Sequence, residues 1–157
     1  MKYWLNTLYI LFAVFTTVAM YSCDDKTVYN KYDHTPIAGW EKNDTLMFDI
    51  PPLPQSGNYQ EAVGLRVNDA YPFMSLCLIV EQKTYPSNNI QVDTINCNII
   101  DKDGYTKGSG ISYYQYNFDL KQVNINKGDS LHVCIRHNMK REILPGISDI
   151  GFAIRQK

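Results

Sequence analysis

Residues 131–136 read Leu-His-Val-Cys-Ile-Arg, so that every second side chain is apolar. Successive side chains of a β-strand point to opposite faces of the sheet, and this period of two therefore indicates a strand with one buried face. A similar pattern occurs in six other segments, residues 46–50, 63–67, 76–80, 91–100, 113–118 and 150–154. Segment 76–80 is apolar on both faces, which predicts a strand in the middle of a sheet.

Turn-forming residues separate these segments, for example Pro51-Pro52, Asn68-Asp69 and Lys127-Gly128-Asp129. Seven short strands predict an all-β fold, a single antiparallel β-sandwich of Greek-key or jelly-roll type. Only residues 138–144 have the character of a helix, of about two turns. The cysteines and tryptophans do not follow the spacing of antibody domains, which argues against an immunoglobulin domain.

The N-terminal segment has the pattern of a lipoprotein signal peptide. Lys2 precedes an uncharged run over residues 8–20. As a helix this run spans roughly 20 Å, whereas the hydrocarbon core of a bilayer is about 30 Å thick. Ser22 directly before Cys23 resembles a lipobox, in which the cysteine receives lipid and cleavage then exposes it. We therefore expect a lipoprotein signal peptide over residues 1–22; an ordinary cleaved signal and an uncleaved anchor are the alternatives.

The expected mature chain has two parts. Residues 23–43 lack periodicity and contain Pro36, which predicts a lipidated N-terminus and a tether, and residues 44–157 are expected to form the β-sandwich domain. Contact with the membrane is expected through the N-terminal lipid. The chain has 15 basic and 16 acidic residues, and loss of Lys2 with the signal leaves a net charge of −2. These charges are scattered, which predicts no nucleic-acid partner.

No residues stand out with the spacing of a catalytic or metal site. His132 and His137 fall on opposite faces of one predicted strand and His34 lies in the tether, so we expect three surface or rim histidines. Asp101-Lys102-Asp103-Gly104 resembles the start of a calcium loop, but Tyr105 follows instead of an acidic or amide ligand, which favours a hairpin turn. We expect no catalytic residue, no metal, no cofactor and no enzymatic activity.

Three cysteines remain besides Cys23, namely Cys77, Cys97 and Cys134. An odd number cannot all pair within one chain, and their spacing gives no redox or zinc motif. Three buried unpaired thiols are favoured over one disulfide with one thiol.

Tyrosine is abundant, with 12 of 157 residues, and three tyrosines gather near one predicted strand. Tyr113, Tyr114 and Tyr116 are the candidate binding residues, because clustered phenol rings form sugar-stacking platforms or protein-binding patches. The alternative is that these rings pack in the sandwich core or shield strand edges.

Short motifs follow one another along the chain: Tyr71-Pro72-Phe73, Asp93-Thr94-Ile95, Gly104-Tyr105-x-x-Gly108-x-Gly110, Lys127-Gly128-Asp129, His137-Asn138-Met139-Lys140-Arg141 and Leu144-Pro145-Gly146-Ile147-Ser148-Asp149-Ile150-Gly151. In this order, and behind a lipoprotein-like start, they resemble the GldH family of gliding-motility lipoproteins from Bacteroidetes. The resemblance covers roughly residues 23–155. Lys140 departs from the family pattern, in which an arginine after the methionine is more usual.

The resemblance implies a non-enzymatic accessory lipoprotein of the gliding machinery, which is linked to type IX secretion. Its partners would be envelope proteins, and it offers no catalytic residues to carry over. It also implies a lipid anchor in the outer membrane. Asp24-Asp25 resembles the acidic signal that directs such lipoproteins to the cell surface, and a periplasm-facing position is the alternative. The competing hypothesis is a glycan-binding surface lipoprotein that uses the three tyrosines.

The last motif also makes local predictions. Gly146 is suited to a positive φ after Pro145, and Gly151 to the close approach of a backbone or a ring. An ion pair between Asp149 and Arg141 would fix the start of the last strand, and two independent surface charges are the alternative.

Overall fold

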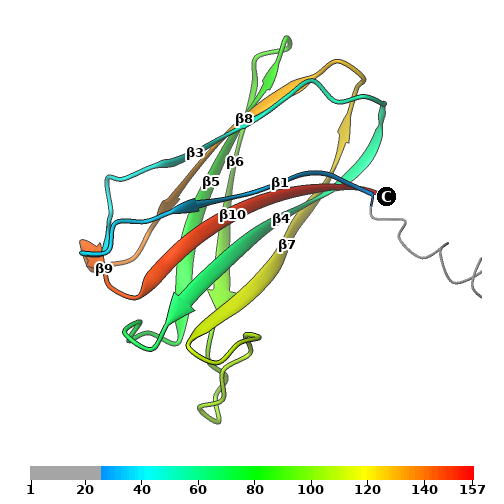
Figure 1. The fold of residues 1–157 in the computed structure, drawn as a ribbon. Coiled ribbons are helices and arrows are strands. Elements are labelled where there is room, and N and C mark those ends of the chain that lie inside the picture. The colour runs from blue at the N-terminus through cyan, green and yellow to red at the C-terminus, as the bar shows by residue number, and fades with distance from the viewer. Residues whose placement is uncertain (1–25) are drawn as a thin grey trace, which may run out of the picture.

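Ten β-strands form the part of the chain that the computed structural model describes, residues 26–157 (Figure 1). In chain order they are β1 (Thr27–His34), β2 (Trp40–Glu41), β3 (Leu46–Ile50), β4 (Gly57–Asn68), β5 (Ser75–Tyr85), β6 (Asn89–Asn98), β7 (Tyr113–Ile125), β8 (Ser130–His137), β9 (Ile143–Leu144) and β10 (Ile147–Gln156). Residues 26–157 contain no helix, and so none that could cross a membrane. The expected signal peptide over residues 1–22 and the expected lipidation site Cys23 lie outside the described residues.

The eight longer strands make two antiparallel sheets that lie one over the other (Figure 1). The strand order is β1-β10-β4-β7 in the first sheet and β3-β8-β5-β6 in the second. Counted along the chain, the first long strand therefore pairs with the eighth, the second with the seventh, the third with the sixth and the fourth with the fifth. This pairing, in which a long antiparallel hairpin is folded over into two sheets, is a jelly roll. The all-β sandwich is confirmed, and of the two arrangements expected for it the jelly roll is the one formed.

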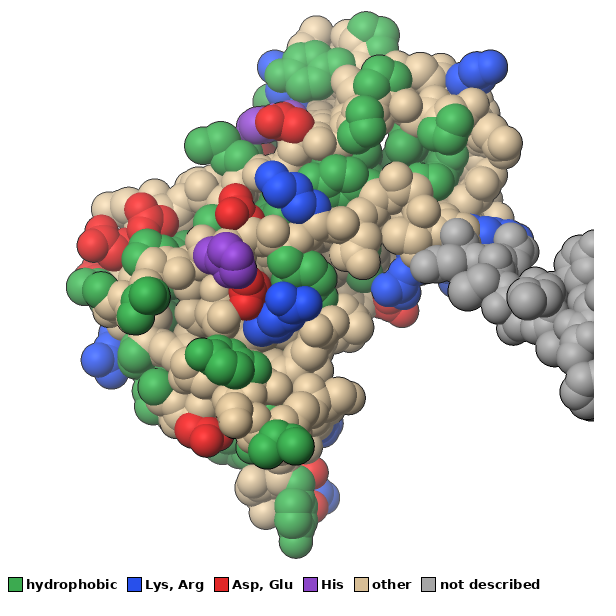
Figure 2. Space-filling model, viewed as in Figure 1, with side chains coloured by type: hydrophobic (Ala, Val, Ile, Leu, Met, Phe, Trp, Pro, Cys, Tyr) green, Lys and Arg blue, Asp and Glu red, His purple; other side chains and the backbone are tan. Residues whose placement is uncertain are grey.

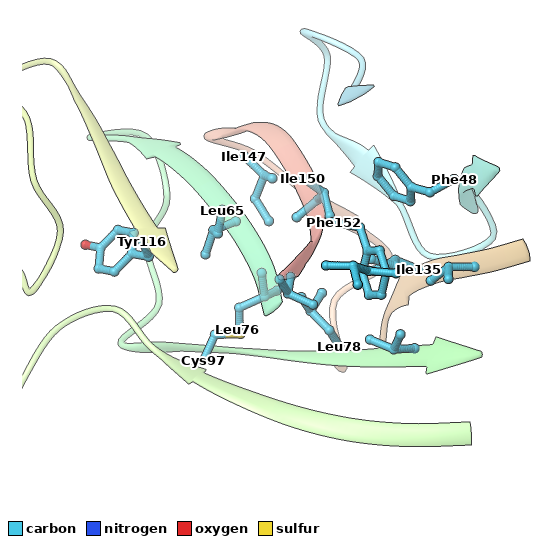
Figure 3. Close-up of a cluster of buried hydrophobic side chains, with 14 of the residues drawn as sticks. Phe48, Leu65, Leu76, Leu78, Cys97, Tyr116, Ile135, Ile147, Ile150 and Phe152 are labelled. Carbon is cyan, nitrogen blue, oxygen red and sulfur yellow. The ribbon is translucent and has the colours of Figure 1, made fainter. Parts of the chain in front are cut away.

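The core lies between the sheets, where the alternating pattern predicted it. Phe48 of β3, Leu65 of β4, Ile135 of β8 and Phe152 of β10 are fully buried and point into the same space (Figure 3). The rings of Phe48 and Phe152 lie 6.3 Å apart and join the two sheets. Burial alternates along the whole of β8, and β5 lies between β8 and β6 as its two apolar faces predicted.

The tether predicted over residues 23–43 is wrong for residues 27–34, which form β1. This strand pairs with β10 along its whole length, from Thr27 opposite Arg155 to His34 opposite Asp149. It is the edge strand of the first sheet, and none of its side chains is fully buried. Backbone hydrogen bonds can hold such a strand without an apolar face, which explains why its sequence lacks the alternating pattern. The sandwich therefore begins close to Thr27 and not at residue 44.

The predicted helix over residues 138–144 is also wrong. Residues 143–144 form the short strand β9, which pairs with β2 as Trp40 opposite Leu144 and Glu41 opposite Ile143. This small clip closes one end of the sandwich, and both Trp40 and Leu144 are fully buried. Gly146, two residues after the end of β9, has φ +80°, as predicted, and a Cβ there would lie 2.2 Å from the backbone nitrogen of Tyr71.

The strands run between two ends of the sandwich, which we call the terminal end and the far end. The terminal end holds the start of β1, the last residues of the chain and the turns over residues 51–56, 86–88 and 126–129. There the Gln156 amide donates a hydrogen bond to the Lys26 carbonyl at 2.8 Å. The far end holds the loops over residues 35–39, 69–74, 99–112 and 138–142. The C-terminus therefore lies beside the first described residues (Figure 1).

Candidate functional site

The far end contains a cavity of about 260 Å³ at the point where β4 ends and β7 begins. The loop over residues 99–112 covers it, and Tyr71 and Ile99 form its apolar wall. Its lining also includes the polar residues Asp69 and Thr106 and the aromatic residue Tyr114. A concave site with mixed apolar and polar lining is the usual form of a small-molecule site, so this is the candidate pocket of the domain.

The three candidate tyrosines do not form one platform. Tyr113 is 55% exposed, whereas Tyr116 is only 5% exposed. Because Tyr113 and Tyr116 are an odd number of residues apart on β7, their rings point to opposite faces of the sheet. Tyr114 is half-buried and lines the far-end cavity together with Tyr116.

Tyr116 is held as a core residue. Its hydroxyl donates to the Ile99 carbonyl at 3.1 Å, so the hydroxyl of Thr106, 2.5 Å away, is the donor in their shared bond. Its ring stacks on Phe118 with the centroids 5.9 Å apart. These contacts fix the loop over residues 99–112 to β7. The alternative that some of the tyrosines pack in the core is confirmed for Tyr116.

A polar network covers the outer face of the first sheet. The ring of Tyr32 lies on Gly64 and Gly151, and a Cβ at Gly151 would lie 2.7 Å from a ring carbon, so the close approach predicted at Gly151 is confirmed. The guanidinium carbon of Arg66 lies 4.3 Å from the centroid of the same ring. Gln115 donates from Nε2 to the Tyr32 hydroxyl at 3.1 Å and accepts from Arg66 Nε at 3.1 Å. The network ties the edge strand β1 to β10, β4 and β7.

Asp149 does not pair with Arg141 as predicted. It lies beside the imidazole Nδ1 of His34, and Arg66 Nη1 is 4.0 Å from its Oδ2. The hydroxyl of Ser148 donates to the same Oδ2 at 2.6 Å. A serine, a histidine and a carboxylate are the groups of a nucleophilic triad, but here the serine hydroxyl points at the carboxylate and not at the imidazole. The cluster therefore fixes the start of β10 and has no activated nucleophile.

His137 lies in the core, so its prediction as a rim residue is wrong. Its ring makes an edge contact with Trp40, with centroids 5.2 Å apart. Nδ1 accepts a hydrogen bond from the Met139 amide at 3.4 Å, and Nε2 therefore carries the proton that goes to the Trp40 carbonyl at 3.2 Å. Burial lowers the pKa of His137, which keeps it neutral. The clip of β2 and β9 covers this end of β8. The alternation of residues along β8 alone does not show that a distant segment covers its end.

The other predicted sites behave more simply. His34 is exposed at its ring, and His132 is half-buried with Nδ1 2.6 Å from Asp49 Oδ1. Asp101 forms the predicted turn, because its Oδ1 accepts from the amides of Asp103 and Tyr105 at 2.9 Å each. Within residues 26–157 no three histidine, cysteine, aspartate or glutamate side chains come close enough together to hold a metal ion.

The three cysteines are unpaired, as the favoured alternative predicted, but the burial expected of all three is wrong for Cys77 and Cys134. Only Cys97 is fully buried, and its burial raises the pKa of the thiol to about 12. Cys77 and Cys134 are half-buried on the outer face of the second sheet. Burial also raises the pKa of Cys134, so this thiol is not an activated nucleophile.

Glu61 is a buried carboxylic acid between the two sheets, which sequence reasoning missed. It is 1% exposed, and its Oε1 has no hydrogen-bond partner. Burial raises the pKa of Glu61 from 4.5 to about 7, and Gln82 and Lys121 oppose this change. Nearby, Lys121 Nζ bridges from β7 to Asp93 and Gln91 of β6. The alternation of residues along this strand places residue 61 on the inner face. A glutamate at that position, however, predicts an exposed surface charge.

We expect Glu61→Gln to stabilise the domain above neutral pH. Because the pKa of this acid is higher in the folded state, wild type loses stability as the pH rises from about 4.5 to about 7 and stays level beyond. The loss amounts to about 3 kcal/mol, and the amide does not titrate. Urea unfolding followed by circular dichroism, at about pH 4.5 and about pH 8, measures both free energies.

Glu142→Gln is the matched control, since Glu142 is exposed. The free energy of unfolding of this variant should fall between the two pH values by as much as that of wild type. If the free energy of unfolding of Glu61→Gln fell between the two pH values as much as that of wild type, Glu61 would not be the group that causes the loss of stability.

The fold and the site together define a class, an all-β jelly-roll domain with a small cavity at its far end. The same fold occurs in part of the GH115 4-O-methyl-alpha-glucuronidase BtGH115A, with a TM-score of 0.50 and 13% identity, over 87% of this chain and 18% of that one. This likeness shows the fold alone.

The chain belongs to the GldH lipoprotein family, whose family model matches residues 27–154. It is 34% identical to the gliding motility lipoprotein GldH of Flavobacterium johnsoniae over 153 residues, which are 89% of this chain and 91% of that protein. It is 26% identical to the GldH homolog of Christiangramia forsetii over 152 residues, 91% of this chain and 92% of that protein. The family resemblance seen in the sequence motifs is confirmed.

Proposed function

We propose that this chain is an accessory, non-enzymatic lipoprotein of the gliding-motility machinery and its associated type IX secretion apparatus, anchored in the outer membrane by lipid on Cys23. Its relatives are named gliding motility lipoproteins, which supports the assignment to that machinery. The cluster of Asp149, His34 and Ser148 lacks the geometry of a nucleophilic site, which supports a binding role over catalysis.

The observation that carries the proposal is the position of the first strand. Cys23 and Thr27 are four residues apart, and four residues span roughly 14 Å at most. A lipid on Cys23 would therefore hold the terminal end of the sandwich against the membrane. The far end would then project away from the membrane, toward other envelope proteins.

The far end has the surface that such a contact requires. Six of the ten large apolar side chains that are exposed in residues 26–157 lie in or beside its loops: Ile37, Met74, Tyr105, Ile111, Tyr113 and Ile143. In Figure 2 hydrophobic side chains reach the surface at the lower left, over these loops. Exposed apolar groups that gather at one end of a domain mark an interaction site.

In-cell photocrosslinking tests the proposal. A photoreactive residue at Ile111 of the far end should capture components of the gliding or secretion machinery in the native bacterium. The matched position Asn126 lies in a terminal-end turn and should capture none of them, because it would face the membrane. Equal capture of the same proteins at both positions, or capture of unrelated proteins alone at Ile111, would contradict the proposal.

Glycan binding is the second candidate function, and the far-end cavity favours it. Its volume of about 260 Å³, with Tyr114 and Asp69 both in its lining, suits one sugar ring held by stacking and a hydrogen bond. The same crosslinking experiment separates the two functions, since polysaccharide-uptake proteins at Ile111 would favour the glycan-binding alternative.

A further inference from the structure

The two sheets have four edge strands, and three of them carry features that prevent a further strand from pairing. Natural sheets protect their edges by short strands, bulges or charged side chains. β3 has only five residues, and β1 carries Lys31 and Asp33 together with a register shift near Thr27. β7 has a register shift opposite Gln60 and carries Asp119.

The fourth edge, β6, lacks these features. It has ten residues, Asn-Ile-Gln-Val-Asp-Thr-Ile-Asn-Cys-Asn, without lysine, arginine or proline. Its pairing with β5 runs from Asn89 to Asn98 without a register shift. Seven of its ten residues are exposed, and Ile90 and Val92 are 56% and 58% exposed. Its one charge, Asp93, is already paired with Lys121.

In an antiparallel pair, alternate residues direct their N–H and C=O groups away from the partner strand. On β6 these groups meet no other strand among residues 26–157, because β6 ends its sheet. A long straight edge with open hydrogen-bonding groups and exposed apolar side chains is the structure that accepts an added strand. We infer that the β6 edge binds an extended segment of a partner protein by strand addition.

The side chains of β6 define the chemistry of that segment. On the outer face, Ile90 and Val92 would lie directly opposite side chains of the incoming strand, which favours apolar residues there. On the inner face the incoming side chains would meet Gln91 and the neutralised pair of Asp93 and Lys121, which favours polar, uncharged residues. The expected segment therefore alternates apolar and polar uncharged residues.

A second copy of this chain does not suit the edge, a point that rests on the proposed lipid anchor. β6 runs from the terminal end to the far end, and two-fold antiparallel pairing would place the second terminal end at the first far end. A strand of ten residues spans about 33 Å, whereas the chain between Cys23 and Thr27 spans roughly 14 Å. Two chains anchored in one membrane would therefore not both reach it.

Amide hydrogen exchange of the full chain in detergent micelles tests the inference. The probe is a synthetic peptide of alternating valine and threonine, as long as β6 and with a lysine at each end for solubility. Its addition should slow exchange at alternate β6 amides, those facing away from β5, by about tenfold or more. The edges β1, β3 and β7 should be unchanged. The same peptide methylated on alternate backbone nitrogens should have no effect, because it cannot form the hydrogen bonds.

Two variants make the test specific. Val92→Lys places a charge on the edge and should abolish the protection, while Met47→Lys, at a side chain 55% exposed on edge strand β3, should leave it intact. No protection at β6, or equal protection on the other edges, would overturn the inference. If the β6 amides exchanged slowly without peptide and the protein had the mass of a dimer, the inference of a partner segment would be overturned. The strand added to β6 would then come from a second copy of this chain. Because this assay contains no native partner, its failure is distinguishable from failure of the crosslinking test.

Discussion

Trp40→Ala should lower the free energy of unfolding by about 3–5 kcal/mol, a large part of the total stability of a domain this size. Trp40 is fully buried in β2, and its Nε1 donates to the Asp44 carbonyl at 3.0 Å. Its ring also contacts His137 of β8, while its backbone pairs with Leu144 of β9. Truncation would leave a cavity under the β2–β9 clip and remove one hydrogen bond.

Circular dichroism during urea unfolding is the suitable measurement, because Trp40 is the only tryptophan after Trp4 and its removal also removes the fluorescence signal. Trp40→Phe keeps most of the volume and should lose clearly less stability than Trp40→Ala. Tyr113→Ala, at an exposed ring, should stay within about 0.5 kcal/mol of wild type. A loss in Trp40→Ala no larger than in Tyr113→Ala would show that the clip does not stabilise the fold.

The inner faces of the long strands were predictable because burial follows the same period as the side chains. On β8, Leu131, Val133 and Ile135 are buried and His132 is not, as the alternation predicts. The jelly-roll order itself depends on which strands pair over long distances in the chain, and local periodicity leaves that open.

The errors share one physical cause, because each involves contacts between residues far apart in the sequence. β1 is held by its backbone pairing with β10 and by Tyr32 on a glycine surface, so its own pattern looks like a tether. His137 is covered by Trp40, and Asp149 lies beside His34, more than a hundred residues away in the chain.

The candidate site was predicted only in part. Of the three candidate tyrosines, Tyr114 and Tyr116 line the far-end cavity and Tyr113 does not, and a binding role for them stays a prediction. Composition does not reveal which face each ring occupies, and Tyr116 is a core residue that anchors a loop. The acid Glu61 and the open β6 edge had no local signal, since both depend on which strands are neighbours.

Cys23→Ala should abolish the attachment of lipid and release the protein from the membrane fraction. The proposed anchor is the lipid on this one residue. Acyl chains supply about 0.8 kcal/mol per buried CH₂, so several chains hold a protein firmly. The jelly roll begins at Thr27 and should still fold in the variant.

Palmitate labelling followed by membrane fractionation in the native bacterium tests the lipid-anchored assignment most directly. Cys134→Ala is the matched control, because it removes an unpaired thiol within the domain. The account predicts label and membrane association in wild type and Cys134→Ala, and neither in Cys23→Ala. Equal labelling and equal membrane association of Cys23→Ala and wild type would contradict it.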